Sequence, residues 1–262
     1  MAKQLLIYSQ VQPVSSQRHR DWAIKQVTDF EFARDVNSVP LMAVEFPNAA
    51  SEMAVVFTGN DDQIMPVVIL GVREQENLYL NDEGQMTSRY VPAFLRRYPF
   101  VFSSSDDGAN FTLCIDETYT GCNQDGVGER LFDAEGEKTQ YLDNVLAFLK
   151  EYQVHFNRTR NFCSKLKELD LLEPMGAQFT QPDGEKLTLT GFMAVNRDKL
   201  KSLTGEQLAD LAKTDALELI YIHLQSMRNF TSMLEKVVGA EASEPAASKE
   251  EAAAPEEEVT LQ

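Results

Sequence analysis

The pattern of apolar and polar positions between residues 39 and 135 predicts short β-strands separated by polar turns. Apolar segments of three to seven residues recur here, and glycine, aspartate or asparagine stands between most of them. The segment 66–72 is apolar on both faces, which is typical of a buried central strand. Residues 81–84 provide a glycine for a hairpin turn. The predicted strands are residues 54–57, 66–72, 78–80, 86–90, 100–103 and 111–115.

From Thr139 the apolar period changes from two residues to three and four, which predicts a long helix to about residue 170. Thr139 can accept a hydrogen bond at the N-terminus of this helix. Its side chains form one apolar stripe, which core packing explains and which also suits a homodimer contact. The stripe consists of Leu142, Val145, Leu149, Tyr152, Phe156, Cys163 and Leu166.

The rest of the chain alternates between the two patterns. A turn at 182–184 is expected to join two strands, the second of which covers 186–195. Asn196 and Thr204 are predicted to cap two short helices. The last helix is expected to run without a break from about residue 215 to 238 and to end at Gly239. It is apolar on two faces, so it belongs in the core or at an oligomer interface.

These patterns together predict an α+β protein. The mainly antiparallel β region covers about residues 39–135, and the long helices follow it. The domain is expected to span residues 39–239. The segment 1–38 remains unassigned, because residues 21–34 fit either a strand pair or a short helix. Residues 240–262 carry seven Glu and one Lys with little apolar bulk, which predicts a disordered acidic tail.

Charge and composition exclude several classes of function. The chain of 262 residues has a net charge of −17, which repels nucleic acid and anionic lipid. No run of eighteen apolar residues occurs, so we expect no membrane insertion. The N-terminus lacks a recognisable signal peptide, and a cytoplasmic location follows as the expectation.

The chain shows no spacing that predicts a metal site or a cofactor. Its three cysteines form no CxxC pair, and its three histidines are dispersed. The acidic glycine turns lack the alternating ligands of a calcium loop. We therefore expect neither a metal nor a cofactor.

Several blocks occurring in order resemble the SapC family of bacterial proteins. The match extends over about residues 39–234 and includes PVVILGVREQENLYL from Pro66, YVPAFLRRYPF from Tyr90, LCIDE from Leu113 and LELIYIHLQSMRNF from Leu217. The family name refers to a surface-layer-associated locus, and some relatives carry permease labels. The resemblance implies no catalytic residues, and the absence of a membrane span contradicts a permease.

The block from Tyr90 to Phe100 contains the first candidate binding residues. Arg96 and Arg97 could clamp a carboxylate or phosphate, with Tyr90 or Tyr98 shaping the pocket. The alternative is a short surface helix whose apolar side chains, Phe94, Leu95 and Phe100, pack inward while the arginines pair with nearby acids.

Asp116 and His223 are the other two candidate site residues. Asp116 and Glu117 end a strand, and adjacent strand residues face opposite sides. A salt bridge to Arg96 or Arg97 is one interpretation of either carboxylate. His223 lies near Ser226 on the last helix, but a buried histidine bound to a nearby oxygen is the simpler interpretation.

Three functions remain open at this point. The favoured hypothesis is a non-catalytic binding or accessory protein that holds a polypeptide partner through an aromatic and arginine-containing surface. The second is an enzyme whose pocket lies near Arg96, Arg97 and Asp116. The third, an envelope or surface-layer export factor, comes from the family name alone. A homo-oligomer fits each of them.

Overall fold

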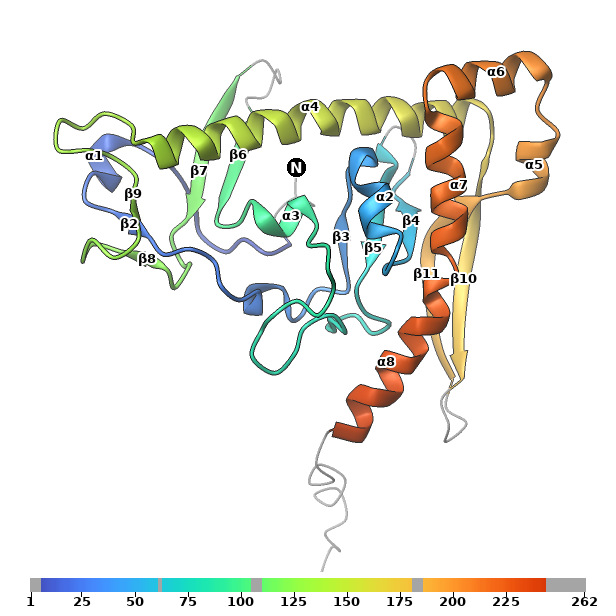
Figure 1. The fold of residues 1–262 in the computed structure, drawn as a ribbon, viewed down its shortest axis with the longest axis horizontal. Helices are drawn as coiled ribbons and strands as arrows, with labels where there is room; N and C mark the ends of the chain where they lie inside the picture. Colours follow the sequence, from blue (N-terminus) through green and yellow to red (C-terminus); the bar gives the residue numbers. More distant parts are fainter. Residues whose placement is uncertain (1–5, 61–62, 105–109, 181–185, 244–262) are drawn as a thin grey trace, which may run out of the picture.

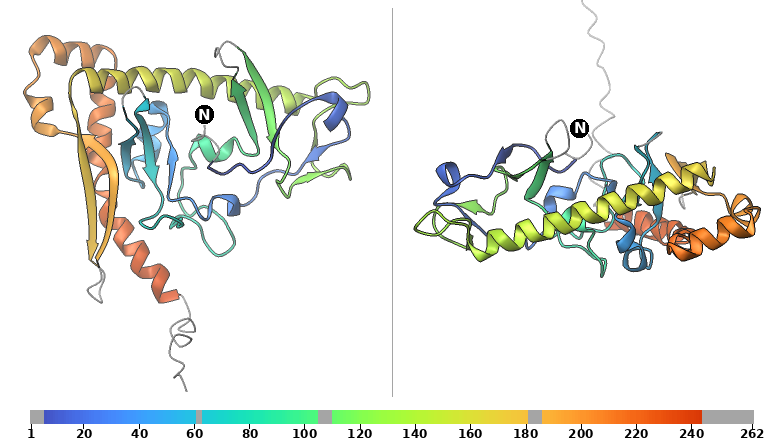
Figure 2. Two further views of the ribbon diagram at one scale, coloured as in Figure 1. Left: turned by 180° about the vertical axis from the view of Figure 1, so that it is seen from behind. Right: turned by 90° about the horizontal axis from the view of Figure 1, so that it is seen from above.

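A computed structural model describes residues 6–60, 63–104, 110–180 and 186–243 of the chain. These residues form three antiparallel sheets and a set of helices, of which one long helix runs along the whole body (Figures 1 and 2). The α+β class predicted from the sequence is confirmed. Most of the link between the predicted strands 100–103 and 111–115, the predicted turn at 182–184, and residues 244–262 of the predicted tail lie outside the described residues.

The largest sheet has five strands in the order β10-β11-β4-β5-β3. The apolar segment predicted as a central strand is β5, which lies between β4 and β3 and is almost entirely buried. The long hairpin of β10 and β11 extends this sheet at one edge, through a single pairing of Met193 with Phe57 of β4. The strands are β3 (Ser38–Pro40), β4 (Val55–Thr58), β5 (Met65–Ile69), β10 (Leu172–Thr180) and β11 (Lys186–Val195).

Two smaller sheets lie toward the other end of the body and include the N-terminal segment. One has the order β1-β7-β6 and the other β8-β2-β9. The residues before position 39, which the sequence leaves unassigned, therefore supply a strand to each sheet. The strands are β1 (Val11–Pro13), β2 (Ala23–Ile24), β6 (Phe100–Ser104), β7 (Phe111–Asp116), β8 (Cys122–Asn123) and β9 (Glu129–Arg130).

The helix α4 (Gln140–Glu168) connects the two ends of the molecule. Its 29 residues span about 44 Å, and Thr139 accepts a hydrogen bond from the Leu142 amide at its start, as predicted. Successive turns of α4 reach different apolar clusters, with Leu142 in one, Tyr152 in a second and Phe162 in the main core. The apolar stripe is thus used mostly for intramolecular packing.

The remaining helices are short except near the C-terminus. Asn196 and Thr204 cap α5 and α6 as predicted, and Thr204 forms a capping box with Gln207. The helices are α1 (Ser16–His19), α2 (Phe46–Ala49), α3 (Ala93–Arg96), α5 (Arg197–Lys201), α6 (Gly205–Lys213), α7 (Ala216–Ser226) and α8 (Asn229–Ser243), with 3-10 turns at Glu31–Ala33 and Ala43–Glu45.

The structure corrects the prediction of one continuous C-terminal helix. The helix breaks between α7 and α8, and α8 continues through Gly239. At the break, the Asn229 side chain donates to the carbonyl oxygens of Ala50 and Met53, each at 2.8 Å. These two tertiary hydrogen bonds fix the start of α8, and helical periodicity carries no information about them.

Two other local predictions also differ from the structure. The expected hairpin around 81–84 is reduced to one bridge between Leu80 and Met86. The segment 21–34 forms neither a strand pair nor an α-helix, because it divides into β2 and the 3-10 turn at Glu31–Ala33.

Candidate ligand-binding site

The helix α3 ends at Arg96, Arg97 follows directly as its C-cap, and a buried carboxylate fixes the start of the helix. Glu45 is 4 % exposed. Its Oε1 accepts hydrogen bonds from the Ala93 amide and the Tyr90 hydroxyl, both at 2.7 Å, and its Oε2 accepts from the Met42 amide at 2.7 Å. Burial and hydrogen bonding to Glu45 raise the pKa of Tyr90. Phe94 and Leu95 pack into the core, as the inward-facing alternative predicts.

Arg96 is the exposed arginine of the pair. Its Nε donates to the carbonyl oxygen of Val91 at 3.0 Å. The guanidinium carbon lies 5.8 Å from the ring centre of Tyr90 and 5.5 Å from that of Phe148 on α4. Within the described part of the chain, no carboxylate pairs with Arg96. Its Nη2 also donates to the Tyr90 hydroxyl at 3.4 Å. The guanidinium is therefore oriented by two hydrogen bonds and two rings.

Arg97 is 5 % exposed and is held differently. Its guanidinium carbon lies 4.3 Å from the ring centre of Phe94, 4.9 Å from that of Tyr152 and 5.6 Å from that of Tyr8. Nε and Nη2 have no hydrogen-bond partner in the described ranges. The Tyr8 hydroxyl donates to the Phe100 carbonyl at 2.8 Å. Burial raises the pKa of Tyr8 to about 12, although the positive charge of Arg97 acts in the opposite direction.

A cavity of about 300 Å³ lies between α3 and the first half of α4. Most of its lining is apolar or aromatic, and both arginines contribute to it. The aromatic members from α4, Tyr141 and Phe148, are partly exposed. The lining consists of Arg96, Arg97, Tyr98, Phe100, Tyr141, Asn144, Val145, Phe148 and Leu149.

A larger groove of about 670 Å³ lies on the other half of α4, against α6 and α7, and some of its charged groups are paired. Lys165 lies 3.0 Å from Asp210, and His155 lies 3.6 Å from Glu151. The Thr159 hydroxyl donates to the His155 carbonyl and accepts from the Ala43 amide. Arg158, Asp215 and Glu218 also line this groove. We place the candidate site at α3, because the cavity there is lined by a buried guanidinium with two nitrogens that no described residue binds.

Tyr98 lies next to Arg97 but faces the core. It is 6 % exposed, and its ring stacks on Phe32 with the ring centres 4.0 Å apart. Burial raises its pKa further from neutrality. The ring of Tyr119 meets it edge-on at 5.4 Å. Tyr98 therefore supports the floor of the cavity rather than offering a polar group to a ligand.

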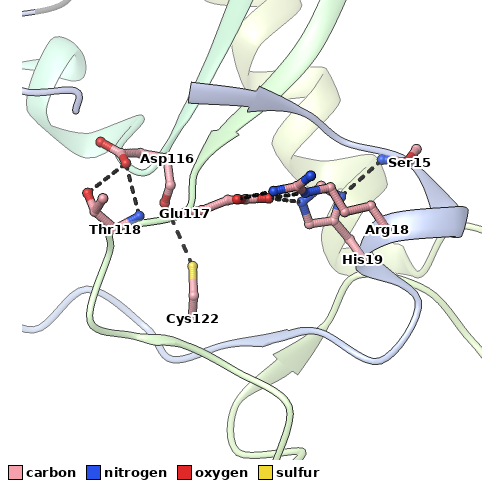
Figure 3. Close-up of polar contacts among 7 residues, drawn as sticks. All are labelled: Ser15, Arg18, His19, Asp116, Glu117, Thr118 and Cys122. Atoms are coloured by element: carbon pink, nitrogen blue, oxygen red, sulfur yellow. Dashed lines mark hydrogen bonds and ion pairs between the residues drawn. The ribbon is translucent and has the colours of Figure 1, made fainter. Parts of the chain in front are cut away.

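Asp116 is fully buried at the end of β7 and binds backbone instead of an arginine (Figure 3). Its oxygens accept from the amides of Ser9, Gln10 and Thr118, and also from the Thr118 hydroxyl at 2.7 Å. Burial opposes ionisation, but these hydrogen bonds hold the pKa of Asp116 below its usual value. Its acceptor capacity is used to attach the N-terminal segment to β7.

Glu117 points to the opposite side and contacts residues that the sequence did not single out (Figure 3). Arg18 Nη2 donates to its Oε2 at 2.6 Å, and His19 Nε2 lies 3.1 Å from its Oε1. The Ser15 amide donates to Nδ1 of His19, so a neutral ring carries its hydrogen on Nε2 and donates it to Glu117. About a hundred residues separate these partners, and no local pattern reveals the pairing.

Comparison with known proteins gives one match. The model of the SapC family matches residues 14–233. The chain belongs to the SapC family. The match confirms the resemblance and begins earlier than residue 39, because the strands of the N-terminal segment are part of the same fold. No curated protein and no solved structure matches the chain.

His223 of this SapC family member is a buried link between two strands. Its Nδ1 donates to the Val55 carbonyl of β4 at 2.7 Å, and its Nε2 accepts from the Val195 amide of β11 at 3.1 Å. Burial lowers its pKa to about 4, so the ring is neutral near pH 7. The Ser226 hydroxyl donates to the backbone carbonyl of His223, not to its ring.

The structure does not bring His223 to the arginines. The strands β3, β5 and β4 lie between α7 and α3 in Figure 1 and in the view from behind in Figure 2. Of the six predicted residues, Tyr90, Arg96, Arg97 and Tyr98 come together around α3. Asp116 and His223 take part in separate hydrogen-bond networks.

The Cys122 thiol, which lies near Asp116, is not a reactive nucleophile either. Burial, followed by the charges of Asp116 and Glu117, raises the pKa of Cys122 to about 12, so its thiol does not ionise near pH 7. No group of three metal-ligating side chains occurs among the described residues. None of the helices in the described ranges combines the length and apolar character needed to cross a membrane.

Proposed function

We propose that this SapC family protein is a non-catalytic accessory protein that binds a polypeptide partner through one surface beside α3. This aromatic–arginine surface consists of Tyr90, Arg96, Tyr141, Val145 and Phe148. All five are exposed or partly exposed, and they line or border the 300 Å³ cavity. Tyrosine and arginine are enriched among the residues that contribute most to binding energy at protein interfaces.

The observation that carries this proposal is the state of Arg96. Its guanidinium is exposed, held by the Val91 carbonyl, the Tyr90 hydroxyl and two rings, and free of carboxylates in the part of the chain that the structure describes. An oriented guanidinium loses less side-chain entropy when a partner binds. It can form a bidentate pair with a carboxylate of the partner without breaking an existing ion pair.

The chemistry of the other predicted residues supports binding over catalysis. The polar atoms of Asp116 and His223 are used by backbone groups. An enzyme that used Arg96, Arg97 and Asp116 would need the Asp116 carboxylate to give up hydrogen bonds that it accepts from the backbone. Association with the envelope, a cytoplasmic location and self-association remain predictions.

The test is a binding measurement with matched variants. The full chain, tagged at its N-terminus, is used to isolate candidate partners from native lysate, and the affinity of each purified candidate is then measured by calorimetry. We expect Arg96→Ala to weaken binding at least tenfold, about 1.4 kcal/mol. Arg89→Ala is the control, because Arg89 is 96 % exposed, lies outside this surface and pairs only at 3.7 Å with Glu52.

Two results would contradict the proposal. One is a partner whose affinity is unchanged by both Arg96→Ala and Phe148→Ala, with the fold of each variant verified by circular dichroism. The other is a small molecule that copurifies and is chemically converted by the protein, which would indicate an enzyme.

A further inference from the structure

The guanidinium of Arg97 is a buried charge that has no counter-ion among the residues that the structure describes. Two carboxylates are buried in the described ranges, those of Glu45 and Asp116, and neither pairs with it. Glu45 accepts hydrogen bonds from two amides and a tyrosine hydroxyl, and Asp116 accepts from three amides and a threonine hydroxyl. The rings around Arg97 provide cation–π attraction, and the Tyr8 hydroxyl also interacts with the guanidinium, but Nε and Nη2 have no acceptor among the described residues.

The two unpartnered nitrogens form one edge of the guanidinium. In arginine, Nε–H and one Nη2–H point in the same direction and are spaced to donate to the two oxygens of one carboxylate. A buried donor pair without an acceptor costs free energy. An anion that supplies two oxygens to this edge removes the cost. The described part of the chain provides no such acceptor, so a bound anion would explain why the edge is left unpaired.

The adjacent cavity offers a place for such an anion. Arg97 lines the 300 Å³ cavity, whose other walls include Leu149, Val145 and Tyr141. Because Nε and Nη2 form no hydrogen bond, none of their bonds has to break when the guanidinium turns toward the cavity. The ring contacts are the main interactions that change, and cation–π contacts are tolerant of small rotations.

The surroundings favour a carboxylate attached to an apolar group. The walls are mainly apolar and aromatic, so they suit the body of such a ligand better than a strongly hydrated phosphate dianion. The net charge of −17 also repels a dianion more strongly than a single negative charge.

We propose that Arg97 forms an internal carboxylate-binding site, which receives a terminal or side-chain carboxylate flanked by an apolar group. The inference rests on the proposed function only in that a polypeptide supplies this group. The carboxylate enters through the cavity between α3 and α4, and Arg97 donates to it through Nε and Nη2. Arg96 is exposed and also lines the cavity, so it is available to the rest of the bound polypeptide.

The probe is phenylacetate, and its neutral amide, phenylacetamide, is the matched control. Binding to the purified full chain is measured by calorimetry at constant ionic strength. We expect saturable binding of phenylacetate and at least tenfold weaker binding of phenylacetamide. Arg97→Met should weaken phenylacetate binding at least tenfold, and Arg97→Lys should also weaken it, since lysine keeps the charge but lacks the paired edge. Arg89→Met should leave it unchanged.

A spectroscopic measurement on the wild-type protein keeps the test independent of variant folding. The Arg97 Nε–H resonance, assigned through contacts with the ring protons of Phe94 and Tyr152, should shift and saturate with phenylacetate. Three results would each overturn the inference. They are equal affinities for phenylacetate and phenylacetamide, an Nε–H resonance that does not shift, and tighter binding of inorganic phosphate than of phenylacetate. Phenylacetate binding is measured without a partner, so its failure is distinguishable from loss of partner binding in Arg96→Ala.

Discussion

The guanidinium of Arg97 lies 4.3 Å from the ring centre of Phe94, three residues before it in the chain, and its Nε and Nη2 form no hydrogen bond. A charge in this position is stabilised by aromatic faces, while two of its nitrogens are withdrawn from water. The neighbouring Arg96 has the reverse arrangement, since it is exposed and hydrogen-bonded. Of these two adjacent arginines, Arg96 is therefore exposed to solvent and Arg97 is buried.

Replacing Arg97 by Met should leave the protein as stable or make it more stable. Removal of the charge eliminates an unpaired buried group, and methionine fills much of the same volume. We expect the free energy of unfolding in urea to change by about 0 to +1 kcal/mol. A loss above about 2 kcal/mol would mean that the cation–π contacts outweigh the desolvation cost. Arg96→Met, at the exposed neighbour, is the control and should change stability by less than about 0.5 kcal/mol.

Substitution of the buried Glu45 should cost far more stability than substitution of an exposed glutamate. In Glu45→Gln, an NH2 group replaces one oxygen and faces donors, either the Met42 amide or the Ala93 amide and the Tyr90 hydroxyl. We expect a loss of about 2 kcal/mol in the free energy of unfolding. The measurement is urea denaturation of the single and double variants with Tyr90→Phe.

The two substitutions should be coupled. Tyr90→Phe alone removes one donor to Glu45 and should cost about 1 kcal/mol, with a smaller cost when Gln already stands at position 45. Strictly additive losses would show that the Tyr90 hydroxyl and the Glu45 carboxylate contribute independently.

Asp116→Asn should loosen the attachment of the N-terminal segment to β7. One carboxylate oxygen becomes an amide that cannot accept, so Ser9, or Gln10 and Thr118, loses its acceptor. We expect a loss of about 2–3 kcal/mol, together with faster amide hydrogen exchange at Ser9 and Gln10. Asp21→Asn is the control, because that side chain is 77 % exposed. Equal exchange rates at Ser9 in wild type and variant would contradict the assignment.

His223 should make stability depend on pH between about 4 and 6.5. Burial lowers its folded-state pKa to about 4, whereas the unfolded chain has the ordinary value of about 6.5. The unfolded state therefore binds a proton first as the pH falls, and stability decreases in this window. The contribution of this one group should fall by about 2 kcal/mol between pH 7 and pH 5.

The comparison with His223→Gln isolates that contribution. Glutamine does not titrate, so the variant should lose less stability than the wild type between pH 7 and pH 5, whatever its stability at pH 7. Denaturation curves at four pH values give the change in the free energy of unfolding with pH for the wild type and for the variant. Parallel slopes would mean that the buried ring is not the group that titrates.

Local patterns in the sequence were sufficient for most of the secondary structure and for part of the site. The period of the apolar positions and the Thr139 cap define α4, because helix geometry and capping act over three or four residues. The short apolar runs define β4, β5, β6 and β7, since side-chain alternation and turn residues are also local. The inward packing of Phe94 and Leu95 beside two arginines followed from the same kind of pattern.

Only the tertiary structure decided which of the candidate groups meet. Asp116 and His223 are bound by backbone groups up to about a hundred and seventy residues away, and Asn229 breaks the last helix through carbonyl groups of a distant segment. Arg96 and Arg97 are adjacent and identical in type, yet one is exposed and the other buried, because consecutive residues at the end of α3 face different surroundings. Hydrogen bonds and burial of this kind depend on contacts between distant segments, and local periodicity reports only on residues a few positions apart.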